Sequence, residues 1–148
     1  METIVMDIDG VLADNSNYKN WFDKSGDFIP EKFEEEILNF KANTWAKELI
    51  RMGSERLINI VILTSRREAF REKTIQWLEN NNIYYDQLST NDEKEDFVQH
   101  KLSVLKDLKS DGYKILFIVE DNPEIVKAER EEGYVVLQPN NLYGDYDE

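Results

Sequence analysis

Two pairs of acidic side chains are the residues of this sequence best suited to chemistry. Asp7 and Asp9 follow a short apolar run near one end, and Glu120 and Asp121 follow another near the other end. Carboxylates two positions apart in an extended chain point to the same side, so one can act as a nucleophile while the other moves protons. Carboxylates of the second pair are the hard oxygen ligands that Mg²⁺ prefers. Together the pairs indicate a site that combines a nucleophilic carboxylate with a divalent cation.

Both pairs also have simpler explanations. Aspartates at the end of a strand often cap backbone N–H groups, and the run 120–122 resembles the acidic start of a helix that opens at Pro123. A calcium loop of the EF-hand type also begins Asp-x-Asp, but it needs Gly at its sixth position and Glu at its twelfth. Those positions are Leu12 and Tyr18 here, which excludes the EF-hand. The two capping explanations stay open on the residues alone.

Hydroxyl and basic residues suited to an anion lie between the acidic pairs. Thr64, Ser65 and Arg66 follow an apolar run, where a hydroxyl can donate to a phosphoryl oxygen and an arginine can bind one with two hydrogen bonds. Lys101 lies on the apolar side of a predicted helix, from which its ammonium group can reach an anion. The alternatives are helix-capping hydroxyls and a lysine whose end group reaches water. His100, the only histidine, is predicted to lie on the surface.

The elements that must position these residues alternate along the chain. Apolar runs predict strands at 3–8, 58–64, 83–85, 114–119 and 134–137, and helical periodicity predicts helices at 30–52, 67–81, 94–110 and 123–133. This alternation is typical of an α/β fold, here a Rossmann-like three-layer sandwich with a mostly parallel central sheet. Ligands bind at the carboxyl ends of the strands in such sheets, which would bring the two acidic pairs together.

Composition limits the classes of function. The 148 residues carry a net charge of −13 and no cysteine, so thiol chemistry is excluded and any phosphate must meet a local positive pocket. The absence of cysteine suits a reducing compartment. We find neither a run long enough to span a membrane nor a signal peptide. The sequence therefore predicts a cytoplasmic protein of one domain, residues 1–148, with no membrane association and no obligate protein partner.

Four motifs, taken in order, resemble those of the haloacid dehalogenase (HAD) superfamily of phosphotransferases. They are Asp7-x-Asp9-Gly10-Val11, a strand ending in Thr64, a downstream Lys101, and a strand ending in Glu120-Asp121. They span almost the whole chain. The resemblance implies a HAD-like fold, a phosphatase that acts on a phosphorylated substrate, and Mg²⁺ as cofactor.

The resemblance also implies roles for the acidic residues. Asp7 would attack phosphorus and carry an aspartyl-phosphate. Asp9 would protonate the leaving oxygen and then activate the water that hydrolyses this intermediate. Mg²⁺ would be held by Asp7, by the backbone carbonyl of Asp9 and by Asp121, and Glu120 is the weaker candidate of the second pair. The physics agrees, because phosphoryl transfer needs positioning and charge neutralisation above all.

Within the superfamily the sequence is most similar to the phosphatase domain of bacteriophage polynucleotide kinase, which removes 3′-phosphates from nucleic-acid ends. Thr64 and Lys101 would bind the phosphoryl oxygens, and Arg66 comes after the hydroxyl at the matching distance. Two positions depart from the pattern, because Ser65 replaces a glycine and Glu120 an aspartate. The absence of a Gly-Lys-Ser/Thr motif excludes kinase activity.

The spacing of the motifs leaves room only for a small cap. One predicted helix and the irregular residues 14–29 fill the stretch between Asp9 and Thr64, so residues 14–57 form at most a minimal cap. An open site suits large substrates such as nucleic-acid ends. A basic cluster agrees with such a substrate, although a solvated helix face explains its last three members: Arg66, Arg67, Arg71 and Lys73.

Other functions stay open. A 5′-nucleotidase or another small-molecule phosphatase would use the same motifs, and Trp21, Phe22 and Phe28 either stack on a nucleobase or belong to the core. A non-catalytic HAD-like binding module is an alternative of a different class, which the intact Asp7 and Asp9 disfavour. A dinucleotide-binding oxidoreductase is excluded, because the sequence has no Gly-x-Gly.

Overall fold

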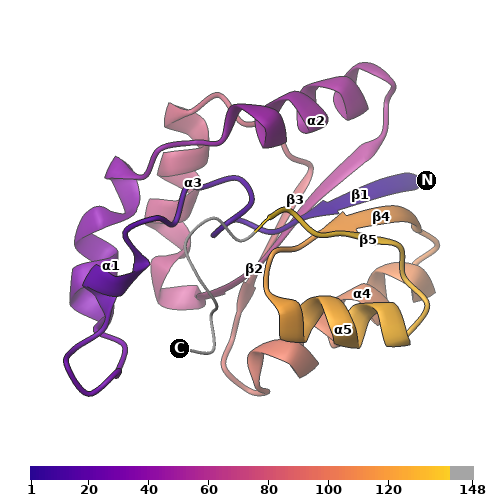
Figure 1. Cartoon of the computed structure of the whole chain (residues 1–148). Helices are drawn as coiled ribbons and strands as arrows, with labels where there is room; N and C mark the ends of the chain where they lie inside the picture. The colour runs from indigo at the N-terminus through magenta and orange to yellow at the C-terminus, as the bar shows by residue number, and fades with distance from the viewer. Residues whose placement is uncertain (141–148) are drawn as a thin grey trace.

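The computed structural model describes residues 1–140 of the chain. Within them, five parallel strands form one sheet in the order β3-β2-β1-β4-β5 (Figure 1). The strands are β1 (Glu2–Met6), β2 (Asn59–Arg67), β3 (Gln87–Asn91), β4 (Lys114–Val119) and β5 (Val136–Leu137). The α-helices are α1 (Pro30–Glu36), α2 (Thr44–Glu55), α3 (Arg71–Asn80), α4 (Phe97–Ser110) and α5 (Pro123–Glu131). Short 3₁₀ turns are η1 (Tyr18–Trp21), η2 (Ile37–Asn39) and η3 (Glu68–Phe70).

Helices cover both faces of the sheet, which gives three layers (Figure 1). On one face, α1, α2 and α3 pack on side chains such as Met6 and Ile62. On the other face, α4 and α5 pack on Val5 and Leu63. Strands buried on both faces need apolar side chains at successive positions, which is why these strands are continuous apolar runs. The predicted α/β three-layer class is confirmed.

The order of the strands brings the carboxyl ends of β1, β2 and β4 together. β1 lies in the centre, where Met6 pairs in register with Ile62 of β2 and with Val119 of β4. Asp7 continues this pairing, because its N–H donates to the carbonyl of Val119 at 3.0 Å. The residues just after these three strands therefore share one edge of the sheet.

The prediction of one continuous helix at 30–52 is wrong, because α1, η2 and α2 occupy this range as separate elements. The chain is extended between η2 and α2. In this stretch the side-chain nitrogen of Asn43 donates to the carbonyl oxygen of Val11 at 2.8 Å. The backbone N–H of Asn43 donates to the carbonyl oxygen of Leu12, also at 2.8 Å. These bonds tie residues 41–43 to the loop after β1. Tertiary hydrogen bonds therefore override the helical periodicity of the segment.

The predicted strand at 83–85 is also wrong, because the strand lies at Gln87–Asn91 instead. Residue Asn82 has a φ of 55°, and the N–H of Ile83 donates to the carbonyl of Leu78, so the chain is still closing the end of α3. Tyr84 is exposed. The apolar content of 83–85 thus reflects a helix terminus rather than a strand.

The sequence from Pro139 onward is polar and acidic, which predicts a loose tail, and this stretch lies almost entirely outside the described residues. Among residues 1–140 no helix has the length and apolar character needed to cross a membrane.

Candidate active site

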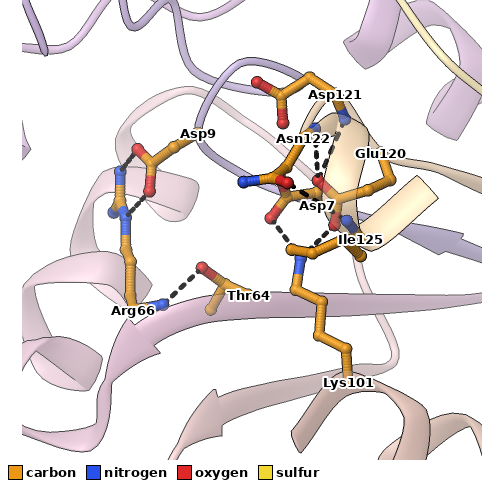
Figure 2. Close-up of polar contacts among 9 residues, drawn as sticks. All are labelled: Asp7, Asp9, Thr64, Arg66, Lys101, Glu120, Asp121, Asn122 and Ile125. Carbon is orange, nitrogen blue, oxygen red and sulfur yellow. Dashed lines mark hydrogen bonds and ion pairs between the residues drawn. The ribbon is translucent and has the colours of Figure 1, made fainter. Parts of the chain in front are cut away.

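Three charged side chains from three elements meet at the carboxyl edge of the sheet (Figure 2). Lys101, on α4, donates from its ammonium nitrogen to Oδ1 of Asp7 at 3.0 Å and to Oε1 of Glu120 at 2.5 Å. Asp7 comes directly after β1 and Glu120 directly after β4. All three residues are buried, and Lys101 is only 1% exposed. The lysine predicted on the apolar side of its helix therefore binds two carboxylates inside the protein instead of reaching water.

The environment of Asp7 disfavours its ionised form. Burial raises the pKa of Asp7 to about 8, the neighbouring carboxylate of Glu120 also acts to raise it, and the ammonium of Lys101 opposes both. Burial likewise raises the pKa of Glu120. One ammonium group thus faces two carboxylates whose charge is not fully balanced, and a further cation at this place would favour their ionised forms.

A third carboxylate completes an acidic group that fits a divalent cation. Asp7, Glu120 and Asp121 each offer an oxygen, and these oxygens lie within 4.8 Å of one another. Glu120 makes further contacts, since its Oε2 also accepts the backbone N–H groups of Asp121 at 3.0 Å and Asn122 at 3.2 Å. The donor set consists of hard oxygens, which suits Mg²⁺.

Asp9 lies apart from this group and points toward Arg66 (Figure 2). Nη2 and Nε of Arg66 donate to the two carboxylate oxygens of Asp9 at 2.8 and 2.9 Å, a bidentate ion pair. Gly10 has a φ of 84°, which lets the chain turn away directly after Asp9 as the sequence indicates.

Arg66 is itself buried and held from several sides. Its Nη1 donates to Oγ1 of Thr74 at 3.1 Å, and its guanidinium lies 5.1 Å from the ring centre of Phe33 and 5.5 Å from that of Phe40. The predicted phosphate ligand Arg66 is therefore bound to Asp9 in this structure. Sequence reasoning missed this partnership, because nothing in the spacing of Asp9 and Arg66 reveals it.

The two hydroxyl residues of the predicted phosphate site differ in their surroundings. Oγ1 of Thr64 accepts the backbone N–H of Arg66 at 3.0 Å, so this oxygen fixes the end of β2. Oγ of Ser65 is buried and has no hydrogen-bond partner among the described residues, and Ser65 lines a pocket at this edge of the sheet. A buried hydroxyl without a partner is uncommon, which makes Ser65 a natural donor to a ligand.

The pocket at this edge has a volume of about 700 Å³. Asp7, Asp9 and Asp121 line it, and the segment predicted to be irregular, 14–29, contributes aromatic side chains to its lining. Its aromatic lining consists of Tyr18, Trp21, Phe22, Phe28, Phe33, Phe70 and Phe97. Trp21 is buried and donates from its indole nitrogen to Glu36 at 2.7 Å, whereas Phe22 is exposed. The aromatic residues thus serve as core and as pocket wall.

Other charged residues depart from the sequence-based expectations. His100 is buried, not on the surface, and it lines a second cavity of about 500 Å³. Glu129 of α5 is fully buried with neither carboxylate oxygen hydrogen-bonded in the described chain. An acidic residue within the periodic apolar positions of 123–133 is the signal that could have revealed Glu129.

The basic cluster does not form one surface. Arg66 binds Asp9, Arg71 donates to the carbonyl of Leu88 and lines the second cavity, and Lys73 donates to the carbonyl of Glu34. Arg67 alone of the remaining three lines the pocket.

Comparison with known proteins identifies the family to which the chain is similar. The family model described as HAD superfamily, subfamily IIIB (acid phosphatase), matches residues 1–146. No curated protein sequence is similar enough to count as a match.

Solved structures share the fold at low sequence identity. A chain of the Pnkp1/Rnl/Hen1 complex is 23% identical with a TM-score of 0.75, over 98% of this chain and 46% of that one. A chain of the Pnkp1/Rnl/Hen1 RNA repair complex is 22% identical with a TM-score of 0.70, over 98% and 43%. The class C acid phosphatase of Bacillus anthracis with tungstate bound is 18% identical with a TM-score of 0.69, over 99% and 69%. The chain therefore spans less than half of the chains from the complex.

Proposed function

The chain belongs to the HAD superfamily, subfamily IIIB, and from this premise we propose that it is a phosphatase, specifically a Mg²⁺-dependent phosphomonoesterase. The observation that carries the proposal is the meeting of Asp7, Lys101 and Asp121 from three elements at one edge of the sheet. A helix cap needs no buried lysine, so the capping explanation of the acidic pairs does not account for this arrangement.

Asp7 is the nucleophile in this proposal. Its carboxylate oxygen forms a bond to phosphorus while the bond from phosphorus to the leaving oxygen breaks, and Asp9 donates a proton to that oxygen. Asp9 then removes a proton from a water molecule, which attacks phosphorus and releases phosphate from Asp7. Both aspartates line the pocket, as these steps require.

Asp7, the backbone carbonyl of Asp9 and Asp121 would hold Mg²⁺ in this proposal, and the carboxylate oxygens that Asp7 and Asp121 offer within 4.8 Å of each other suit a hard cation. The bound ion would supply positive charge that offsets repulsion between Asp7 and the phosphate. Glu120, whose oxygens already bind Lys101 and two backbone N–H groups, instead positions the lysine.

Three residues would bind the phosphoryl oxygens. The ammonium group of Lys101 lies beside Asp7, so it can stabilise the negative charge that develops on the phosphoryl oxygens during attack. Ser65 offers an unpartnered hydroxyl, and the hydroxyl hydrogen of Thr64 can still be donated, because the bond to Arg66 uses only its oxygen. Arg66 holds Asp9 in place and does not take a phosphate oxygen in this proposal.

The favoured substrate is a polynucleotide with a terminal 3′-phosphate. The likeness of fold to a chain of an RNA repair complex supports it, as does a pocket that opens to solvent with Arg67 among its lining residues. The alternative is a nucleotide or another small phosphate ester, which the aromatic pocket wall favours. A cytoplasmic location and a minimal cap at 14–57 stay predictions.

A substrate panel tests the proposal. The purified protein is assayed with Mg²⁺ on an aryl phosphate, a 3′-phosphorylated oligonucleotide, its 5′-phosphorylated isomer and mononucleotides. We expect turnover that chelation of the metal abolishes, with the 3′-phosphorylated oligonucleotide preferred. Absence of turnover on every ester would favour the non-catalytic binding module, and turnover confined to mononucleotides would favour the nucleotidase.

A further inference from the structure

Arg67 occupies a distinctive position at the mouth of the pocket. It is the last residue of β2, it pairs in register with Asn91 of β3, and its side chain is 40% exposed. Its Nε lies 3.1 Å from Oε1 of Glu93, and its guanidinium lies 5.3 Å from the ring centre of Phe28. Arg67 thus joins the aromatic segment to the loop between β3 and α4.

The charge around Arg67 is otherwise negative. Glu93, Glu95 and Asp96 line the same pocket, and the only other arginine or lysine among the described lining residues is Arg66, whose charge faces Asp9. A nucleic-acid strand that places its terminal phosphate at Asp7 must carry further phosphodiesters out through this mouth. In an acidic wall, Arg67 is the group that can receive one of them.

The partner of Arg67 is held in an unusual backbone conformation. Glu93 has a φ of 64°, which non-glycine residues rarely adopt, and the side chain of Asn91 accepts its N–H at 2.8 Å. Glu93 is exposed, so its ion pair with Arg67 is weak and exchangeable. A phosphodiester can therefore displace this carboxylate and form an ion pair with Arg67 in its place.

On this basis we propose that Arg67 is the specificity residue that selects a nucleic-acid end over a mononucleotide, by exchanging Glu93 for the phosphodiester next to the terminal nucleotide. This inference rests on the proposed phosphatase function of the same site. A mononucleotide has no such phosphodiester, so it leaves the Arg67–Glu93 pair intact.

The test compares kcat/KM for a single-stranded oligonucleotide with a 3′-phosphate and for the matching 3′-mononucleotide. The ratio is kcat/KM for the oligonucleotide divided by kcat/KM for the mononucleotide. We expect Arg67→Gln to lower this ratio about tenfold, which is the scale of one lost charge-assisted hydrogen bond. The slope of log(kcat/KM) for the oligonucleotide against log salt should become shallower by about 0.7, as expected for one lost contact to a single strand. Glu93→Gln should raise the ratio, because it removes the competing carboxylate.

Matched controls separate a specific contact from general charge. Lys94→Gln removes the same charge one residue after Glu93, at a side chain that is 83% exposed and lines the second cavity instead. Glu131→Gln, at an exposed position of α5, matches Glu93→Gln. Both controls should leave the ratio unchanged. An equal change in Arg67→Gln and Lys94→Gln, or an unchanged ratio in Arg67→Gln, would overturn the proposal.

Binding gives a second measurement that does not need turnover. In an Asp7→Asn background, fluorescence anisotropy with a labelled 3′-phosphorylated oligonucleotide should show weaker binding after Arg67→Gln but not after Lys94→Gln. If no ester is turned over by the wild type, the proposed function fails, while this binding difference still decides the role of Arg67. If the wild type hydrolyses only mononucleotides and Arg67→Gln does not weaken oligonucleotide binding, the specificity role proposed for Arg67 is wrong. The proposed phosphatase activity is then still supported.

Discussion

Both oxygens of Asp9 accept hydrogen bonds from one guanidinium, that of Arg66, at 2.8 and 2.9 Å. This pair ties the loop after β1 to the end of β2. Arg66 is almost fully buried, so a flat, doubly bonded contact fixes the carboxylate in both position and orientation. The proposed acid–base residue is therefore held by the side chain that sequence reasoning assigned to phosphate.

Arg66→Lys distinguishes the two roles. Lysine keeps the charge but loses the bidentate geometry, so Asp9 should be misplaced and kcat on an aryl phosphate should fall about 10- to 100-fold. The inhibition constant of inorganic phosphate should change little if Arg66 acts only through Asp9. Thr74→Val is the control, because it removes only the neutral contact of Nη1. A large rise in the inhibition constant of inorganic phosphate with kcat preserved would show that Arg66 binds the phosphate instead.

Asp7→Asn should abolish turnover and make the metal-free protein more stable. Burial raises the pKa of Asp7 from 3.8 to about 8, so the folded state holds a proton that the unfolded state releases between these values. Stability from this group is therefore present at low pH and is lost as pH rises through that window. Asparagine never ionises, so the variant should melt a few degrees above the wild type at pH 8, and the difference should shrink at pH 5.

In the same melting experiment, Mg²⁺ should make the wild type more stable than Asp7→Asn and so reverse the order of their melting temperatures. The wild type should gain stability from Mg²⁺ at pH 8, because a bound ion favours ionised Asp7, whereas Asp7→Asn should gain less. A variant that retains turnover would remove Asp7 as the nucleophile. A melting temperature of the wild type that does not change when Mg²⁺ is added would count against the metal site.

Asp121→Asn and Glu120→Gln should affect metal dependence differently. If Asp121 is a ligand, its loss should raise the Mg²⁺ concentration for half-maximal activity about tenfold or more. Glu120 already binds Lys101 and two backbone N–H groups, so Glu120→Gln should lower kcat with a much smaller change in the Mg²⁺ titration. Equal shifts in the two titrations would make Glu120 a ligand as well.

The sequence predicts the layers of this fold and the convergence of its motifs well, because both depend on local patterns. Continuous apolar runs identify β1, β2 and β4, and a parallel sheet places the residues after these strands at one edge. Lys101 could be singled out because a lysine on an apolar face needs a partner. In each of these cases a short stretch of sequence carries the whole signal.

The features that the sequence could not predict depend on contacts between distant residues. The break before α2 rests on hydrogen bonds from Asn43 to the loop after β1, and the pairing of Arg66 with Asp9 spans 57 positions. Whether a basic residue faces the pocket, as Arg67 does, or the second cavity, as Arg71 does, depends on packing at the end of β2. Local patterns contain none of this information.

Glu129 should make the stability of the protein depend on pH. Its carboxylate is fully buried without a hydrogen bond in the described chain, and burial raises its pKa from 4.5 to about 7, with the ammonium of Lys101 opposing. The folded state therefore keeps a proton that the unfolded state loses, so stability falls as pH rises from about 4.5 through 7. The loss should be on the order of 3 kcal/mol by pH 8.

Glu129→Gln isolates this contribution, since glutamine has a similar shape and does not titrate. Urea unfolding at pH 5 and pH 8 should show a smaller difference between the two free energies of unfolding in the variant than in the wild type. The difference, not the absolute stability, is the readout, because a buried amide also needs partners. Glu131→Gln, exposed on the same helix, should retain the wild-type difference. Equal pH dependence in wild type and Glu129→Gln would mean that Glu129 ionises without cost, which a fully buried carboxylate without a hydrogen bond in the described chain should not do.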